Sequence, residues 1–185
     1  MPMNPAPAET LLLPHPDYAA APVAAIAVAA ARRADGGLTL NYRLQGNLAG
    51  LRLPAAPLDP DRLWAHTCFE VFLARGEAAA YREYNFSPTG QWAAYAFAAY
   101  RQREAGAAAL PAPLLAWQGR PDGLALEVTL PAAALPAGDG PLALALTAVL
   151  ELADGAPGQL SYWALAHPPG QADFHHRDGF ALSLP

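Results

Sequence analysis

Lysine is absent from this chain, and all 11 of its basic residues are arginine, against 16 acidic residues and a formal net charge of −5. Charged residues of either sign make up only 15% of the sequence. Proteins that bind nucleic acid neutralise its phosphates with clusters of lysine and arginine, and the sequence contains no such cluster. Nucleic acid is therefore not an expected partner.

Cysteine is nearly absent too, because Cys68 is the only one. A single cysteine excludes an internal disulfide and agrees with a reducing compartment. Cys68 lies in the middle of a predicted strand, where we interpret it as a small buried hydrophobe rather than a nucleophile. Met1–Pro5 lacks the charged start and apolar stretch of a signal peptide, and no apolar run reaches the roughly 18 residues of a membrane helix. We expect a cytoplasmic protein with no membrane partner.

What the sequence has instead is many short, alternating segments separated by glycine and proline. Hydrophobic residues make up 54% of 185 residues, which suits one domain with a substantial core. Val23–Arg33 and Leu38–Gln45 form a predicted hairpin, and Leu124–Leu130 alternates as a half-buried strand does. We predict an all-β, single-domain antiparallel β-sandwich, jelly-roll or immunoglobulin-like, of about eight to ten strands. It spans residues 23–185, after an extended proline-rich arm at 1–22.

The segment from residue 66 to residue 73 carries polar and apolar residues on opposite faces. His66, Cys68, Glu70 and Phe72 share one face, because side chains alternate along a strand. The other face, with Phe69 and its apolar neighbours, is the predicted core face. A polar face in an alanine-rich protein is where we expect function.

Two turns decide which residues lie beside this polar face. A hairpin turn centred on Gly76 and Glu77 places Glu70 opposite Glu83. A turn at 87–90 then places Trp92 beside Asn85 on the same face. Like charges directly opposed on a sheet cost about 0.2–1 kcal/mol, so the two glutamates need an arginine, a shared proton or a ligand. The structural alternative is that an arginine such as Arg43 or Arg101 pairs with them and nothing binds.

A second polar group follows near the C-terminus. Trp163 and His167 share a face of the predicted strand 161–167, and Asp173, His175 and His176 lie in the loop beyond Pro168. The spacing of these residues matches no closed zinc pattern, so we expect no metal site and interpret the histidines as loop residues hydrogen-bonded to the backbone. If this loop lies at the same end of the sandwich as Glu70, the two groups form one site.

Three motifs together resemble a known group of proteins. They are the segments 67–73 (TCFEVFL), 84–92 (YNFSPTGQW) and 161–168 (SYWALAHP), the last followed by Asp173-Phe174-His175. In this order, over residues 20–184, they are similar to bacterial DOMON-like proteins, distant relatives of family-9 carbohydrate-binding modules. The resemblance implies a β-sandwich that binds a small ligand, and the wider superfamily holds sugars or haem.

We expect a non-catalytic module that binds a sugar or sugar derivative, because tryptophan rings stack on pyranose rings while carboxylate, amide and imidazole groups bind hydroxyls. The candidate ligand-binding residues are His66, Glu70, Glu83, Asn85, Trp92, Trp163, His167, Asp173 and His175. For Trp92 and Trp163, packing in the core is the alternative.

Haem is the alternative ligand. It needs an axial ligand in an apolar pocket, and haem-binding relatives use methionine and histidine. Methionine occurs only at positions 1 and 3, which leaves ligation by His66, His167 or His175. No Cys-x-x-Cys-His sequence for covalent attachment is present.

Catalysis and protein interaction are the contrasting functions. In the predicted register Glu70 and Glu83 lie about 5 Å apart, the carboxyl separation of a retaining glycosidase. However, no Gly-x-Ser-x-Gly motif and no glycine-rich phosphate loop occur, and we predict no enzyme. A pure protein-interaction module would expose a large apolar patch instead of a polar pocket.

Overall fold

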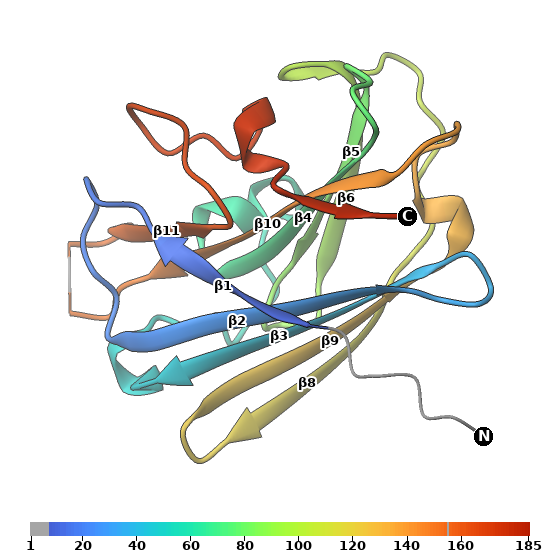
Figure 1. Ribbon diagram of the computed structural model, residues 1–185. Coiled ribbons are helices and arrows are strands. Elements are labelled where there is room, and N and C mark those ends of the chain that lie inside the picture. Colours follow the sequence, from blue (N-terminus) through green and yellow to red (C-terminus); the bar gives the residue numbers. More distant parts are fainter. Residues whose placement is uncertain (1–7, 155) are drawn as a thin grey trace.

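The alternating segments form two antiparallel sheets that pack face to face (Figure 1). The structure is a computed structural model, and it describes residues 8–154 and 156–185. The prediction of an all-β sandwich is confirmed, and the described residues form twelve strands instead of the predicted eight to ten. In addition to the strands, four short 3₁₀ helices lie at Leu48–Gly50 (η1), Pro60–Ala65 (η2), Ala132–Ala134 (η3) and Arg177–Gly179 (η4).

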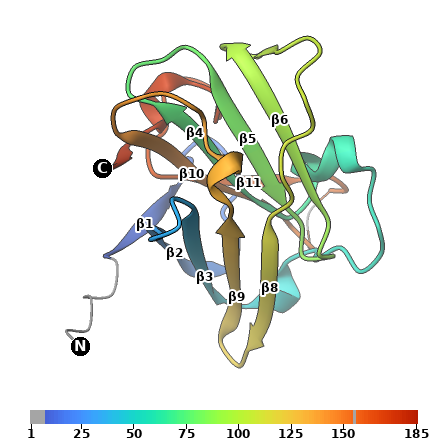
Figure 2. The same cartoon turned by 90° about the vertical axis from the view of Figure 1, so that its right-hand side faces the viewer.

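The first sheet has the strand order β1-β2-β3-β9-β8, which Figure 2 shows from the side. Its strands are β1 (Glu9–Pro14), β2 (Val23–Arg32), β3 (Leu38–Gly46), β9 (Gly123–Leu130) and β8 (Leu114–Arg120). The hairpin predicted over residues 23–45 is present as β2–β3, and the predicted strand Leu124–Leu130 lies within β9, which pairs with β8.

The second sheet has the order β7-β6-β5-β4-β10-β11, and β12 pairs with the start of β10. Its strands are β7 (Gln102–Arg103), β6 (Trp92–Ala99), β5 (Tyr81–Phe86), β4 (Cys68–Arg75), β10 (Leu142–Glu151), β11 (Leu160–Ala164) and β12 (Leu182–Leu184). Strand β1 joins the two sheets. Its residues 9–12 pair with β2, while Leu13 and Pro14 pair with β11. The predicted arm 1–22 thus contains a strand of the sandwich, and residues 1–7 lie outside the described part.

The main core fills the space between the sheets. From β4 it receives Phe69, Val71 and Leu73, all nearly inaccessible to solvent, as the alternation predicted. The ring of Tyr42 on β3 packs edge-on against Phe69, with ring centroids 5.2 Å apart. The Tyr42 hydroxyl also donates a hydrogen bond of 2.7 Å to the backbone carbonyl of Glu70, which ties the first sheet to the second.

The outer face of the second sheet is covered as well, so strand β4 is buried on both sides. The chain beyond β11 crosses this face, drawn in red in Figure 1. There Phe174 and Phe180 pack against a second apolar cluster that contains Phe72 and Phe97. Helix η2 covers the other end of the face through Leu63, which contacts Cys68. No helix in the described residues is long and apolar enough to cross a membrane.

The register of the β4–β5 hairpin differs from the prediction by two residues. Glu70 lies opposite Asn85, and Glu83 lies opposite Phe72, so the two glutamates are diagonal neighbours. The cause is a longer loop, in which Ala78 closes a turn onto the Arg75 carbonyl at 2.8 Å. Because the shift is even, Glu70 and Glu83 still share one face.

The register of the β5–β6 hairpin differs by one residue, which reverses the faces of β6. Trp92 pairs with Phe86 instead of Asn85, because the loop includes Gln91. The Ser87 amide bonds the Gln91 carbonyl at 2.9 Å, and Gly90 adopts a φ of 84°, a conformation that favours glycine. Trp92 consequently lies on the core face, and the prediction that it joins the polar face is wrong.

Replacing Tyr42 by phenylalanine should lower the free energy of unfolding by about 0.5–1.5 kcal/mol, because it removes a buried hydrogen bond between the sheets. Urea denaturation of the two proteins measures the difference. Tyr18→Phe is the matched control, because the Tyr18 hydroxyl forms no hydrogen bond within the described residues, and a change there should cost less than about 0.5 kcal/mol. Equal losses in the two variants would show that the bond does not stabilise the sandwich.

Candidate functional site

A pocket of about 540 Å³ lies on the outer face of the second sheet, beneath the C-terminal segment. Strands β4, β5, β6, β10 and β11 form its floor, and helix η2, the β6–β7 segment and the loop before η4 form its walls. It is lined by Trp64, Glu70, Phe72, Glu83, Tyr95, Phe97, Arg101, Arg103, Val149, Tyr162, Ala172, Phe174 and His175. The polar face predicted from the sequence is thus the floor of a real cavity.

Glu70 is the most deeply buried acid of this floor, with 2% of its surface exposed. Its Oε2 accepts a hydrogen bond of 3.3 Å from Thr147 on β10, but its Oε1 has no partner among the described residues. Burial raises the pKa of Glu70 well above its usual range, and the charge of Glu83 raises it further. An unpartnered buried carboxyl oxygen costs free energy, so it calls for a missing partner.

Glu83 is the second acid, on the neighbouring strand β5. Its Oε1 accepts a hydrogen bond of 2.6 Å from the side-chain amide of Asn85, which is itself buried. Burial raises the pKa of Glu83 to about 6, although Asn85, Arg103 and Arg101 all oppose the shift. Near neutral pH the pocket therefore holds at least one ionised carboxylate close to Glu70.

His175 brings the C-terminal segment into the site. Its Nδ1 lies 2.8 Å from the Tyr81 hydroxyl, which also accepts a bond of 3.0 Å from the Arg101 amide. The Tyr81 proton is therefore free to donate to Nδ1, which assigns the histidine proton to Nε2. That Nε2 lies 3.9 Å from Oε2 of Glu83. Burial, assisted by Arg101, lowers the pKa of His175 to about 4, so the ring is neutral at pH 7.

Two arginines lie at the pocket, and each has an acidic neighbour of its own. Arg101 pairs with Asp173 at 2.9 Å. Arg103 lies 3.9 Å above the ring of Tyr95 and 4.0 Å from a carboxylate oxygen of Asp61. Within the described residues, neither arginine forms an ion pair with the two floor glutamates. The alternative that an arginine pairs with them is thus wrong for Arg101, although Arg101 and Arg103 both act to lower the pKa of Glu83.

Arg43 does not pair with the two floor glutamates either. This residue pairs with Glu9 on the first sheet, far from the floor of the pocket. Glu70 and Glu83 therefore share the pocket floor without an arginine partner in the part of the chain that the structure describes.

Six of the thirteen residues that line the pocket carry a phenyl, phenol or indole ring. They come from strands β4, β6 and β11, helix η2 and the loop before η4, and they are Trp64, Phe72, Tyr95, Phe97, Tyr162 and Phe174. Trp64 stands at the rim, 49% exposed, on helix η2. The Tyr95 hydroxyl bonds Asp61 at 3.0 Å, and burial raises the pKa of Tyr95 to about 12. The site thus combines apolar ring faces with a few polar groups, as small-ligand pockets do.

Of the nine candidate residues, the structure gathers five at this site. Glu70, Glu83 and His175 line the pocket, Asn85 supports Glu83, and Asp173 holds Arg101 at the rim. The two polar groups of the sequence therefore do converge, through the loop that carries Asp173 and His175.

The other four candidates lie elsewhere. Trp92 and Trp163 pack in the core between the sheets, so they cannot serve as platforms for a ligand in the pocket. His66 donates to Glu151 at 2.8 Å, and His167 donates to the Leu13 carbonyl at 2.8 Å; neither lines the pocket. The predicted strand 161–167 ends at residue 164, so His167 lies beyond β11.

Several side chains that line the pocket were missed by sequence reasoning. Tyr95 and Phe97 were missed because the one-residue error in the β5–β6 hairpin turned them toward the core. Trp64 was missed because helix η2 was not predicted, although Asp59 followed by Pro60 is a helix-start signal: Asp59 caps η2 and Pro60 opens it.

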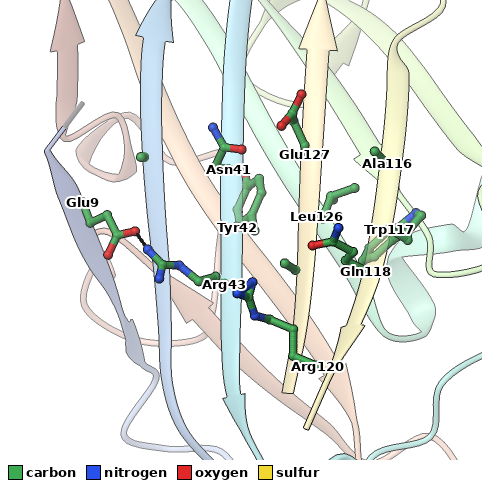
Figure 3. Close-up of a pocket in the computed structure, with 12 residues that line it drawn as sticks. Glu9, Asn41, Tyr42, Arg43, Ala116, Trp117, Gln118, Arg120, Leu126 and Glu127 are labelled. Atoms are coloured by element: carbon green, nitrogen blue, oxygen red, sulfur yellow. Dashed lines mark hydrogen bonds and ion pairs between the residues drawn. The ribbon is translucent and has the colours of Figure 1, made fainter. Parts of the chain in front are cut away.

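A second hollow of about 410 Å³ lies on the outer face of the first sheet (Figure 3). Small residues such as Ala29 and Ala125 are among those that line it. Arg43 reaches along the sheet to Glu9. Its two rings, Tyr42 and Trp117, belong to the core packing beneath. It lacks a buried carboxyl group, so the pocket on the second sheet is the better candidate site.

Comparison with known proteins shows similarity at the level of the fold. No protein-family model matches the sequence, and no curated protein matches it significantly. A family-9 carbohydrate-binding module from Caldicellulosiruptor kristjanssonii, solved with cellotriose, is 11% identical with a TM-score of 0.59, covering 87% of this chain and 74% of that one. The same kind of module solved with glucose has a TM-score of 0.54 at 11% identity, over 79% and 69% of the two chains.

A third solved structure is described as a putative carbohydrate-binding protein from Bacteroides uniformis. It is 16% identical, with a TM-score of 0.65, and the match covers 92% of this chain and 83% of that one. The chain shares the fold of these proteins.

Glu83→Gln should stabilise the protein at neutral pH by up to about 2 kcal/mol, because the native fold holds the carboxyl pKa near 6 instead of 4.5. With a raised pKa the native state binds more protons, so the burial of Glu83 costs stability as pH rises from 4.5 through 6. The gain of the variant should therefore vanish below pH 4.5. Urea denaturation across this range measures it. A difference that does not change with pH would contradict the assignment.

Proposed function

We propose that this chain is a non-catalytic module that binds a sugar or a sugar derivative in the pocket on the second sheet. The observation that carries the proposal is the pocket floor, where Glu70 and Glu83 lie buried beneath a wall of aromatic rings. Sugars present both kinds of surface that such a pocket complements, apolar ring faces and hydroxyl groups. The shared fold with modules solved with cellotriose and glucose supports the same function.

The polar groups of the pocket match the hydroxyls of a sugar. Glu83 offers Oε2 as an acceptor, and Glu70 offers Oε1. His175, neutral and protonated on Nε2, offers a donor beside Glu83. The hydrogen bonds from Asn85 to Glu83 and from Thr147 to Glu70 fix these groups before a ligand arrives, which reduces the entropy lost on binding.

Trp64 and Tyr95 are the proposed stacking surfaces. Trp64 stands exposed at the rim, where a ring has a free face. Tyr95 is held by its bond to Asp61 and by the Arg103 guanidinium on one face of its ring. A rigid ring loses little conformational entropy when a sugar packs against it.

The three sequence motifs support a DOMON-like affiliation, which we propose together with this function; a cytoplasmic location stays a prediction from the sequence. Haem does not fit the pocket as well. Of the three candidate axial ligands only His175 lines it, with Nδ1 bonded to Tyr81 and Nε2 directed at Glu83. The two methionines, at positions 1 and 3, lie outside the described residues.

Catalysis is also not part of the proposal. Glu70 and Glu83 lie side by side on adjacent strands of one floor, diagonal in register, and both project from the same surface. A glycosidase places its two carboxyls on either side of the bond that it breaks. The arrangement suits holding a ligand better than cleaving one.

Trp64→Ala should weaken saccharide binding at least about tenfold, because it removes an exposed ring from the pocket rim without opening the core. Calorimetric titration with glucose, cellobiose and cellotriose measures the change. Trp92→Phe is the matched control: it replaces a tryptophan on the core face, so it should lower stability and leave affinity unchanged. A loss of affinity confined to Trp92→Phe would refute the location of the site.

A further inference from the structure

The charges around the pocket are not balanced. Two floor acids, Glu70 and Glu83, and two rim acids face only the two arginines, and each arginine lies against one of the rim acids, Asp173 or Asp61. His175 adds no positive charge near neutral pH, because its pKa is about 4. Arg101 and Arg103 line the same cavity as Glu70 and Glu83, but among the described residues neither arginine forms an ion pair with either glutamate.

Burying Glu70 and Glu83 together without a ligand lowers the free energy of unfolding. Like charges in one site repel, and burial disfavours the ionised form of each. Thr147 and Asn85 each satisfy one carboxyl oxygen, which leaves Oε1 of Glu70 without a partner and Oε2 of Glu83 with only a distant contact at 3.9 Å. A ligand that brings both a positive charge and several hydrogen-bond donors would satisfy both oxygens at once.

A metal ion does not meet this requirement well. Calcium takes six to eight oxygen ligands, whereas the described residues contain no group of three or more histidine, cysteine, aspartate or glutamate side chains placed to hold an ion. An ammonium group does meet it, because it carries three N–H donors on one compact charge. Aromatic rings also attract cations, and Phe72, Phe97 and Tyr162 line the same cavity.

We infer that the preferred ligand is an amino sugar, whose protonated amine lies between Glu70 and Glu83 while its ring packs against the aromatic walls. This inference rests on the proposed function and narrows it from sugars in general to sugars that carry a positive charge. It assigns Glu70 and Glu83 a role in specificity. The acetylated form of the same sugar, which lacks the charge, is then a poor ligand.

Matched pairs of ligands test the inference. Calorimetric titration of the full chain near neutral pH compares glucose with glucosamine, galactose with galactosamine, and each amine with its N-acetyl form. Charge-assisted hydrogen bonds are stronger than neutral ones, so the amine of a pair should bind about tenfold or more tightly than its neutral partners. Glu70→Gln and Glu83→Gln should each bring this affinity ratio toward one. Glu77→Gln, in the exposed β4–β5 turn, is the control and should keep it.

The possible results separate the inference from the proposed function. If amines bind more tightly and the ratio collapses in the two pocket variants, both stand. If neutral sugars bind as well as the amines do, the inference is overturned and sugar binding is retained. If no sugar of either kind binds, the proposed function fails and the inference fails with it. A preference for amines that survives in both pocket variants also overturns the inference, because residues other than Glu70 and Glu83 then bind the positive charge of the sugar.

Discussion

The burial of Glu70 without a countercharge is the constraint on which the site depends. Strand β4 is enclosed on both sides, by the core on one face and by the C-terminal segment on the other. A carboxyl group on such a strand is disfavoured unless something compensates its desolvation. The hydrogen bond from Thr147 compensates the desolvation of one carboxyl oxygen of Glu70 and leaves the other oxygen without a partner among the described residues. The raised pKa of Glu70 means that a bound proton relieves part of this cost, but Oε1 still has no partner among these residues, and a ligand in the pocket would supply one.

The rest of the architecture serves to create this enclosed floor. The sandwich core fixes β4 from below through Phe69 and through the Tyr42 bond to the Glu70 carbonyl. From above, the chain after β11 brings His175 onto the sheet, where it packs against Phe72 at 5.1 Å and bonds Tyr81. Among the residues that the structure describes, none covers the outer face of the first sheet in this way, and its outer hollow carries solvent-exposed pairs such as Arg43 with Glu9. Binding chemistry therefore concentrates on one face of one sheet.

How far the sequence predicts this molecule depends on how local each feature is. Alternation along a strand is local, so the separation of Glu70 from Phe69 onto opposite faces was predicted correctly. Register across a hairpin depends on loop length, and one extra residue, Gln91, was enough to exchange Trp92 for Tyr95 on the pocket face. The approach of His175 to Glu83 depends on long-range packing, which no local pattern encodes. The sequence could not separate His175, which lines the pocket, from His66 and His167, because composition alone does not show where a histidine side chain points.

The most direct test is a crystal structure of the protein with a bound saccharide. The account predicts ligand density on the outer face of the second sheet, between Trp64 and the carboxyl groups of Glu70 and Glu83, with Oε1 of Glu70 in hydrogen-bonding contact. Density in the hollow of the first sheet, beside Arg43 and Trp117, would contradict it. So would a saccharide that contacts only the exposed surface of the protein and leaves Glu70 and Glu83 untouched.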